Sequence, residues 1–433
     1  MEIKKLNAVL VGAGNRGCCY ADYSLAVPSE LQIIAVVEPS EIRRNEAVKR
    51  YNVKQDMAFA SLDDFLSKKI ECDFIINATM DENHYETAKK IIKAKYNMLL
   101  EKPIVPNIEE LLELQNLVKE NGVKVNVCHV LRYTPFFKAV KTLIDNGDIG
   151  KILTMEMNEH VWIAHFIDSY VRGKWNSKAR CGSGFLLAKS CHDTDLMCWL
   201  NNKTKPVKVS SFGSRSLFIK ENAPEGATEF CYNCPHNEKC LYSAQKIHLE
   251  YDPMPFQTWM AMGKPIDEIT KEEKAEWLKT SEYGKCAYES GGDINDRQVV
   301  NVEFENGSIA SFTMVGGSSK AGRWMHIVGT CGEIEGELET GKFIIRRFDR
   351  SGDKFWFNEE TVDVSDLVYE NENYSGHAGG DYAIMNELVR FFNGDNSSVS
   401  ITSIDDSVNG HLIVYGAEKS IEEGRCINLK EDF

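Results

Sequence analysis

A glycine-rich loop and an acidic residue near the start of the chain could bind a dinucleotide. The loop, Gly12-Ala13-Gly14-Asn15-Arg16-Gly17, follows an apolar run and precedes a helical pattern, the setting in which a GxGxxG sequence binds a pyrophosphate. Glu38 ends the next apolar run, about 20 residues later, where an acid accepts hydrogen bonds from a ribose. Its charge repels a 2′-phosphate, so the pattern favours NAD over NADP, although Arg43 and Arg44 lie close enough to contact a phosphate. The alternative is a fold of this type that binds no cofactor.

Lys102 and His192 are the candidate groups for proton transfer. Lys102 follows a strand-like run, at the sheet edge where ligands bind in such folds. His192 lies in a helical stretch, and its ordinary pKa of about 6.5 suits proton exchange at neutral pH. Asp195, three residues further on, could orient its imidazole. Removal of a hydride from an alcohol requires a group that accepts the hydroxyl proton. The alternatives are a solvated lysine and a structural histidine.

The candidate metal site comprises Cys231, Cys234, Cys240 and Cys286. The CxxC spacing of the first two is typical of ligands around one tetrahedral ion, which indicates a structural zinc site. Cys286 is the expected fourth ligand, with His236 and His248 as alternatives. A disulfide or metal-free packed thiols are the other interpretations.

The elements that position these residues divide the chain in two. Apolar runs at 6–11, 31–37, 74–78, 98–100 and 123–127 alternate with helical patterns. This rhythm predicts a Rossmann-type, doubly wound parallel sheet. Ser61 and Asn107 have the character of helix N-caps, and Gly122 that of a helix end.

After residue 128 the pattern predicts an α+β domain with a large, mostly antiparallel open sheet. Strand-like runs occur at 151–158, 207–212, 297–315, 325–329 and 342–347, and Asn306-Gly307 marks a hairpin turn. We therefore expect an NAD-binding domain over 1–127 and a domain for substrate binding and oligomerisation over 128–433. The polar, cysteine-containing stretch 220–285 is expected to be an insertion.

Composition limits the class of partner. Of the 433 residues, 65 are Asp or Glu and 50 are Lys or Arg, which gives a formal net charge of −15. Such acidity argues against binding to nucleic acid or to anionic membranes. No apolar run approaches the ~18 residues of a membrane span, and no secretory signal is evident. We expect a cytoplasmic protein that acts on a small molecule.

The pairing of the glycine loop with Glu101-Lys102-Pro103 resembles the Gfo/Idh/MocA oxidoreductases. The resemblance covers essentially the whole chain, and a subgroup with a similar cysteine cluster is most alike. Further matching segments are Ala78-Thr79, His84, 132–135, the region of His192, 376–381 and 405–420. The resemblance implies NAD-dependent oxidation of a hydroxyl of a sugar, sugar derivative or cyclitol, at the seam between the two domains, and a homodimer or homotetramer.

The resemblance also assigns roles to residues. Lys102 would bind the reacting hydroxyl, while Thr79, His84 and Glu101 would join the glycine loop in binding the cofactor. The candidate substrate residues are Arg172, Trp175, Asn176, Lys189, Asp296 and His377. Many relatives have an Asp four residues before the histidine, where this chain has Ala188, so the proton relay must differ. A redox-assisted glycosidase and a non-catalytic NAD sensor remain as alternatives.

Overall fold

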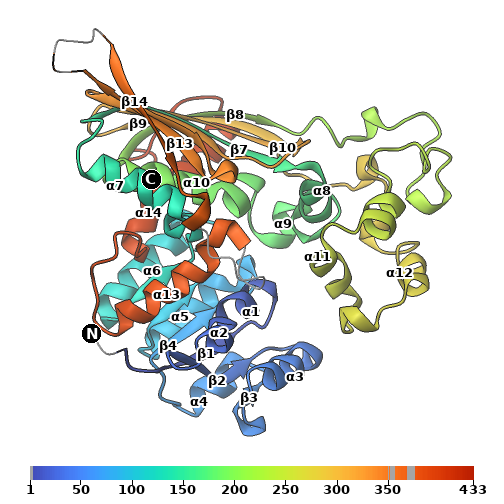
Figure 1. Cartoon of the computed structure of the whole chain (residues 1–433). Helices are drawn as coiled ribbons and strands as arrows, with labels where there is room; N and C mark the ends of the chain where they lie inside the picture. The colour runs from blue at the N-terminus through green and yellow to red at the C-terminus, as the bar shows by residue number, and fades with distance from the viewer. Residues whose placement is uncertain (1–2, 350, 352–355, 368–375) are drawn as a thin grey trace.

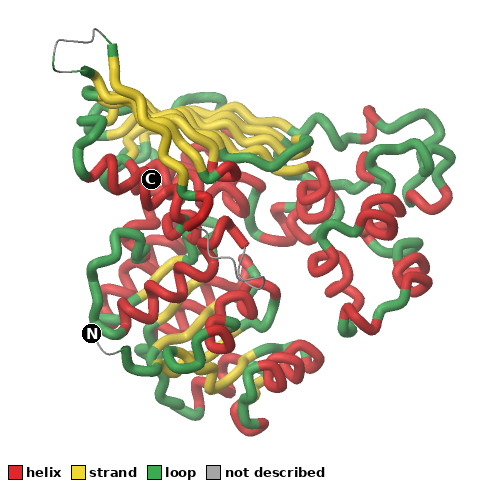
Figure 2. The backbone as a smooth tube through the Cα atoms, in the orientation of Figure 1, coloured by secondary structure: helices red, strands yellow, loops and turns green. Residues whose placement is uncertain are grey.

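Two sheets and the helices around them form the protein, here described from a computed structural model (Figure 1). The structure describes residues 3–349, 351, 356–367 and 376–433. One sheet, with its helices, lies below the other in the view of Figure 2, and an arm of short helices and loops extends to the side. The site residues predicted from the sequence all fall within the described ranges.

The first sheet has six parallel strands in the order β3-β2-β1-β4-β5-β6. The strands are β1 (Leu6–Val11), β2 (Leu31–Val37), β3 (Ala58–Phe59), β4 (Phe74–Asn77), β5 (Met98–Leu100) and β6 (Val125–Val127). The helices between them are α1 (Asn15–Ala21), α2 (Tyr23–Ala26), α3 (Glu41–Arg50), α4 (Leu62–Ser67), α5 (His84–Lys93) and α6 (Ile108–Asn121). This arrangement confirms the predicted Rossmann sheet, in which apolar strands are covered by helices on both faces.

Local signals in the sequence define the helix ends. The Ser61 side chain accepts a hydrogen bond from the backbone N–H of Asp64 at the start of α4. Asn107 does the same for Glu110 at the start of α6, and Gly122 ends that helix with φ +66°. Each cap satisfies a backbone group that the helix itself leaves unpaired. The predicted helix starts are confirmed.

The second sheet has nine strands in the order β14-β13-β12-β11-β7-β10-β9-β8-β15. The strands are β7 (Ile152–Trp162), β8 (Pro206–Ser214), β9 (Arg297–Phe304), β10 (Ile309–Ser318), β11 (Trp324–Gly329), β12 (Gly332–Glu337), β13 (Lys342–Phe348), β14 (Phe357–Asp363) and β15 (Ile427–Asn428). Only β7 and β10 pair in parallel, so the predicted, mostly antiparallel sheet is confirmed. Gly307, with φ +84°, turns the predicted hairpin between β9 and β10.

Helices from the second half of the chain join the two sheets. Helix α10 (Phe185–Leu200) and helix α14 (Ile404–Glu423) pack beneath the second sheet. Helix α13 (Gly380–Phe392) packs on the first sheet, where the rings of Phe392 and Phe74 stack at 5.0 Å. The remaining α-helices are α7 (Pro135–Asp145), α8 (Ile163–Phe166), α9 (Lys178–Cys181), α11 (Pro255–Trp259) and α12 (Lys271–Trp277). Helix α13 comes from the C-terminal half of the chain but packs on the first sheet. The division into two domains at residue 127 therefore stays a prediction.

Residues 220–285 form the arm in Figure 1 and contain short helices and turns. Their own small core consists of Trp259, Ile269 and Leu278. Among all helices built from the described residues, none combines the length and apolarity needed to cross a bilayer.

Candidate active site

The glycine-rich loop between β1 and α1 has the shape that a dinucleotide requires. Gly12 has φ +88°, and a Cβ there would lie 2.5 Å from the carbonyl oxygen of Ala78. A Cβ on Gly17 would lie 2.0 Å from the carbonyl oxygen of Gly12, so helix and strand pack closely only without a side chain. Gly14 faces open space, Asn15 is exposed, and no side chain caps α1. The loop therefore fits an NAD pyrophosphate at the helix start.

Glu38 is buried at the end of β2 and is tied to this loop. Its carboxylate accepts hydrogen bonds from the N–H groups of Ala13 and Ser40, both at 2.9 Å, and from Arg43 at 2.7 Å. Arg44 donates instead to the carbonyl oxygen of Glu38 at 2.7 Å. A ribose hydroxyl must therefore share the carboxylate with Arg43.

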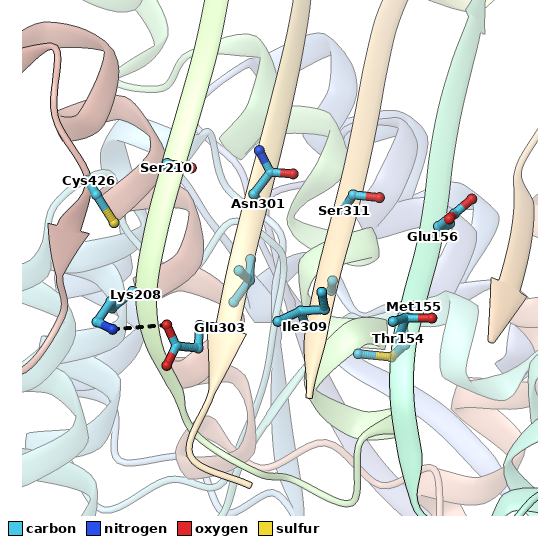
Figure 3. Close-up of a pocket in the computed structure, with 12 residues that line it drawn as sticks. Thr154, Met155, Glu156, Lys208, Ser210, Asn301, Glu303, Ile309, Ser311 and Cys426 are labelled. Atoms are coloured by element: carbon cyan, nitrogen blue, oxygen red, sulfur yellow. Dashed lines mark hydrogen bonds and ion pairs between the residues drawn. The ribbon is translucent and has the colours of Figure 1, made fainter. Parts of the chain in front are cut away.

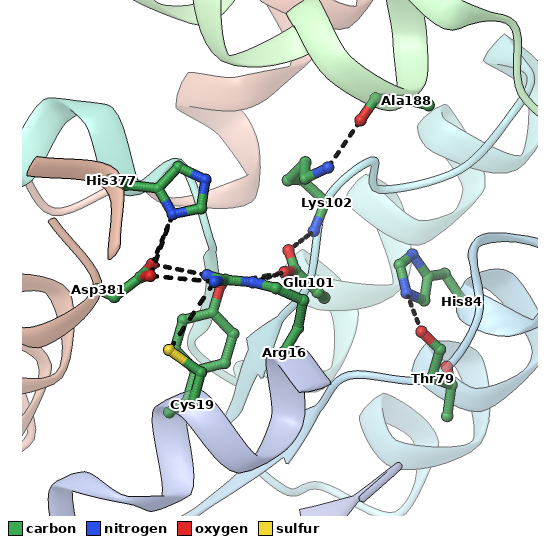
Figure 4. Close-up of polar contacts among 10 residues, drawn as sticks. Arg16, Cys19, Thr79, His84, Glu101, Lys102, Ala188, His377 and Asp381 are labelled. Atoms are coloured by element: carbon green, nitrogen blue, oxygen red, sulfur yellow. Dashed lines mark hydrogen bonds and ion pairs between the residues drawn. The ribbon is translucent and has the colours of Figure 1, made fainter. Parts of the chain in front are cut away.

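Arg16 links the loop to the C-terminal half of the chain (Figure 4). Its guanidinium lies 2.9 Å from Glu101 and 2.7 Å from Asp381, and it donates to the Tyr20 hydroxyl at 2.6 Å. Although burial opposes ionisation, His377 and Arg16 hold the pKa of Asp381 well below its usual value. Arg16 and Glu101, which we expected to bind cofactor, bind each other and so join α1, β5 and α13.

Thr79 and His84 shape the turn that presents Lys102. The ring nitrogens of the buried His84 lie 2.6 Å from the carbonyl oxygen of Pro103 and 3.1 Å from that of Thr79. The Lys102–Pro103 peptide bond is cis. The His84 side chain therefore positions this turn by binding backbone carbonyl oxygens of the turn. These contacts do not require a ligand.

Lys102 reaches across the seam between the two halves to the helix that carries His192. The Lys102 ammonium donates to the carbonyl oxygen of Ala188 at 2.7 Å, one helical turn before His192 on α10. His192 is 4% exposed, and its Nδ1 has no hydrogen-bond partner. Burial, and then Lys102 and His129, lower the pKa of His192 well below its usual value. The imidazole is therefore neutral at pH 7 and can accept a proton.

Asp195 does not orient His192, contrary to the expectation from its spacing. Both of its carboxylate oxygens accept hydrogen bonds from Arg132, at 2.6 and 2.5 Å. The rings beside His192 are those of His129 and His377, with centroids at 5.7 and 6.0 Å. His377 lies 3.1 Å from Asp381 and its side chain is 30% exposed, so this predicted substrate residue does lie at the seam.

Three predicted substrate residues are engaged elsewhere. Buried Arg172 donates to the carbonyl oxygens of Lys285 at 2.7 Å and Tyr242 at 2.6 Å, which anchors the insertion. Asn176 is also buried, and its backbone carbonyl oxygen accepts a hydrogen bond from the N–H of Asp293. Asp296 accepts from two backbone N–H groups, those of residues 216 and 217, at 2.7 and 2.6 Å. The side chains of Arg172 and Asp296 thus bind backbone groups, and the role of all three residues in substrate binding stays a prediction.

Trp175 and Lys189 lie nearer the seam. The Trp175 indole N–H donates to Asp81 of the first half at 3.2 Å. Lys189 lies 3.6 Å from Glu159, and Arg323 lies 2.7 Å from Glu159 and 2.9 Å from Asp193. Glu159 and Arg323 escaped the sequence analysis because they come from β7 and from the residue before β11, with no motif to connect them.

The four cysteines of the insertion, Cys231, Cys234, Cys240 and Cys286, line one small cavity of about 10 Å³. All four are free thiols. Within the described ranges, no group of three or more His, Cys, Asp or Glu side chains is placed to hold a metal ion. The structure therefore does not support the predicted zinc site.

The outer face of the second sheet carries a hollow of about 420 Å³ (Figure 3). Side chains from β7, β8, β9 and β10 line it, and Lys208 there pairs with Glu303 at 3.0 Å. Helices α10 and α14 pack on the opposite face, together with His192. This hollow is therefore separate from the Lys102–His192 seam.

Comparisons with known proteins cover both halves. A model of an oxidoreductase family's NAD-binding Rossmann fold matches residues 6–129, and a model of its C-terminal α/β domain matches residues 141–429. YteT of Bacillus subtilis is 23% identical over 375 residues, which cover 83% of this chain and 82% of YteT. D-xylose dehydrogenase of Paenarthrobacter nicotinovorans is 28% identical over 178 residues, which cover 40% of this chain and 46% of that enzyme.

Among solved structures, levoglucosan dehydrogenase in complex with NADH and levoglucosan has the same fold. Its TM-score is 0.68 at 17% identity, with 98% of this chain and 99% of that chain covered. The two family models together span most of the sequence, and the glycine loop has the geometry that the first of them describes. The chain belongs to the Gfo/Idh/MocA family of NAD-binding oxidoreductases.

Proposed function

We propose that the protein is an NAD-dependent dehydrogenase that oxidises a hydroxyl group of a sugar, sugar derivative or cyclitol. The observation that carries this proposal is the meeting of Lys102 with the helix turn of Ala188 and His192. It brings a cation and a neutral imidazole together beside the glycine loop. The likeness to D-xylose dehydrogenase over 178 residues supports the same class of substrate.

When bound, NAD supplies the acceptor for the hydride that leaves the alcohol carbon. The chain's own residues accept the hydroxyl proton and stabilise the negative charge on the hydroxyl oxygen. Lys102 uses one N–H on Ala188, and its remaining N–H groups can bind the hydroxyl oxygen and stabilise negative charge there. His192 receives the hydroxyl proton as the C=O bond forms, because its lowered pKa keeps the imidazole unprotonated at pH 7. Thr79, His84 and Glu101 hold the turn before Lys102, and Glu38 favours NAD over NADP.

The backbone carbonyl oxygen of Ala188 takes the place of the aspartate that many relatives have at this position. Where many relatives present a carboxylate side chain, this chain presents the Ala188 carbonyl oxygen to the lysine. A carbonyl can orient the ammonium but cannot carry a proton. In this chain the proton must therefore leave through His192, whose neighbours are the rings of His129 and His377.

A screen of sugars, inositols and glycosides with NAD⁺ tests the proposal, with NADH and released aglycone followed in parallel. We expect NADH in proportion to oxidised product, and loss of that signal in Lys102→Met and His192→Asn variants that still bind NAD⁺. Aglycone release without net NADH would favour a redox-assisted glycosidase. Binding of NAD⁺ without any turnover would favour a sensor.

The same proposal includes self-association through the second sheet. Phe212, Val299 and Ile309 are 78%, 38% and 54% exposed on three adjacent strands. Large side chains of this kind on an open sheet face commonly mark an interface. We expect a homodimer or homotetramer, which light scattering of the purified protein measures.

A further inference from the structure

Two cations close to His192 have hydrogen-bonding groups that the protein does not use. Arg323 engages Glu159 and Asp193 through its Nε alone, at 2.7 and 2.9 Å. No residue in the described part of the chain accepts a hydrogen bond from either of its Nη groups. Lys189 likewise donates no hydrogen bond to these residues, and its ion-pair partner Glu159 is 3.6 Å away. An ammonium and one guanidinium edge are therefore available to a ligand.

These cations lie on the accessible side of the cluster. The side chains of Lys189 and Arg323 are 15% and 10% exposed, whereas those of Glu159 and Asp193 are 4% and 1% exposed. Lys189 and Asp193 are one turn apart on α10, and Glu159 points from β7 toward that helix. A ligand that approaches from solvent would therefore contact the side chains of Lys189 and Arg323, because the two carboxylates are more deeply buried.

His165 on α8 places this cluster beside the proposed catalytic pair. Its pKa is lowered to about 2 by burial and by the neighbouring Lys189, His377, Arg323 and Lys102. These neighbours come from both halves of the chain and include the lysine that would bind the reacting hydroxyl. On α10, Lys189 follows Ala188 and Asp193 follows His192, so the cluster adjoins the carbonyl that Lys102 binds.

The geometry points to a carboxylate subsite: Lys189 and the Nη edge of Arg323 bind a carboxylate of the substrate, so the substrate class is acidic sugars, such as uronic or aldonic acids. This inference rests on the proposed dehydrogenase function and narrows it. The planar edge of a guanidinium matches the two oxygens of a carboxylate, and an adjacent ammonium adds a charge-assisted hydrogen bond.

A monoanion suits the cluster better than a phosphate dianion. Glu159 and Asp193 already share the two cations, and burial raises the pKa of Asp193 to about 7. Since two carboxylates already balance the two cations, one added carboxylate upsets the charge of the cluster less than a phosphate dianion does.

Calorimetric titration of the NADH-saturated protein with matched sugars tests the inference. The pairs are D-glucuronate with D-glucose, D-galacturonate with D-galactose, and D-gluconate with sorbitol, with glucose 6-phosphate as the phosphate arm. We expect at least one acid to bind about tenfold or more tightly than its neutral partner, the value of one charge-assisted contact. Equal binding within every pair, or tighter binding of the phosphate, would overturn the inference.

Variants of Lys189 and Arg323 test whether these two residues cause the preference for acids over neutral sugars. Lys189→Gln should weaken binding of the acid far more than binding of the neutral partner and so remove most of the preference, while Lys189→Arg should retain it. Arg323→Lys keeps the charge but loses the planar edge, so the acid should bind several-fold more weakly. Lys208→Gln, on the outer sheet face, is the matched control and should behave as wild type. A preference that survives Lys189→Gln would refute the subsite.

The two proposals fail in different ways. If acids bind in a manner that depends on Lys189 but no alcohol yields NADH, the subsite stands and the dehydrogenase function fails. If neutral sugars yield NADH as efficiently as the acids, the dehydrogenase function stands and the subsite is overturned.

Discussion

Replacing His192 by asparagine removes the proposed proton acceptor at small cost to the fold. Nδ1 of His192 has no hydrogen-bond partner in the described structure, so the substitution breaks no hydrogen bond at that atom. General base catalysis contributes about 10²–10⁴-fold to rate, and we expect kcat to fall by that factor. Binding of NAD⁺ should be unchanged, because it depends on the glycine loop and Glu38.

The same variant reports the charge state of His192. Burial, followed by Lys102 and His129, lowers the pKa in the folded protein, whereas the unfolded chain has the ordinary value of about 6.5. As the pH falls below that value, the unfolded chain binds a proton that the folded protein does not, so stability decreases. Between about pH 7.5 and pH 5.5 this term is on the order of 1 kcal/mol. The asparagine side chain does not titrate, so the stability of the variant lacks this dependence on pH.

Urea unfolding of both proteins at these two pH values measures the difference. The wild type should lose on the order of 1 kcal/mol more stability than His192→Asn over that interval. His326→Asn, a change on β11 outside the seam, is the kinetic control and should retain wild-type kcat. A stability difference that does not change with pH would mean that folded His192 binds a proton as readily as the unfolded chain does, which would refute the lowered pKa that keeps it neutral.

Four further expectations follow from the contacts described above. Lys102→Met should lower kcat by about 100-fold or more in an NADH assay, with an unchanged Tm, because its ammonium makes one hydrogen bond to a carbonyl. Glu38→Ser should weaken NADH and strengthen NADPH binding by cofactor fluorescence; a wild type that prefers NADPH would contradict the assignment. Asp381→Asn should destabilise the fold by about 2–3 kcal/mol in urea, since Arg16 loses a charged partner, and a loss below about 0.5 kcal/mol would show the pair to be unimportant. Phe212→Glu should yield a monomer by light scattering, and an unaltered oligomer would place the interface elsewhere.

The sequence was sufficient for features that depend on neighbouring residues. The glycine loop needs three glycines at fixed spacing, and the structure shows what a Cβ at two of them would meet. The N-caps Ser61 and Asn107 act on residues three positions away, so the sequence alone identifies them. Strands β3 and β15 escaped prediction because each has two residues, too few to form a pattern. The longer strands β12 and β14 were missed as well.

The seam was harder to predict because its members come from distant segments. Arg172 and Asp296 are polar residues in irregular segments, and only the fold shows that their side chains bind backbone groups. Spacing placed Asp195 on the face of His192, but Arg132, 63 residues away, binds it. The cysteines do gather as their spacing indicates, yet gathering alone does not arrange ligands around a metal.

The most direct test of the account is a crystal structure of the protein with NADH and a sugar acid that it binds. The account predicts that one hydroxyl oxygen of the sugar lies at about 2.6–3.2 Å from both the Lys102 ammonium and the His192 imidazole. A sugar bound elsewhere, or a hydroxyl that contacts neither side chain, would contradict it.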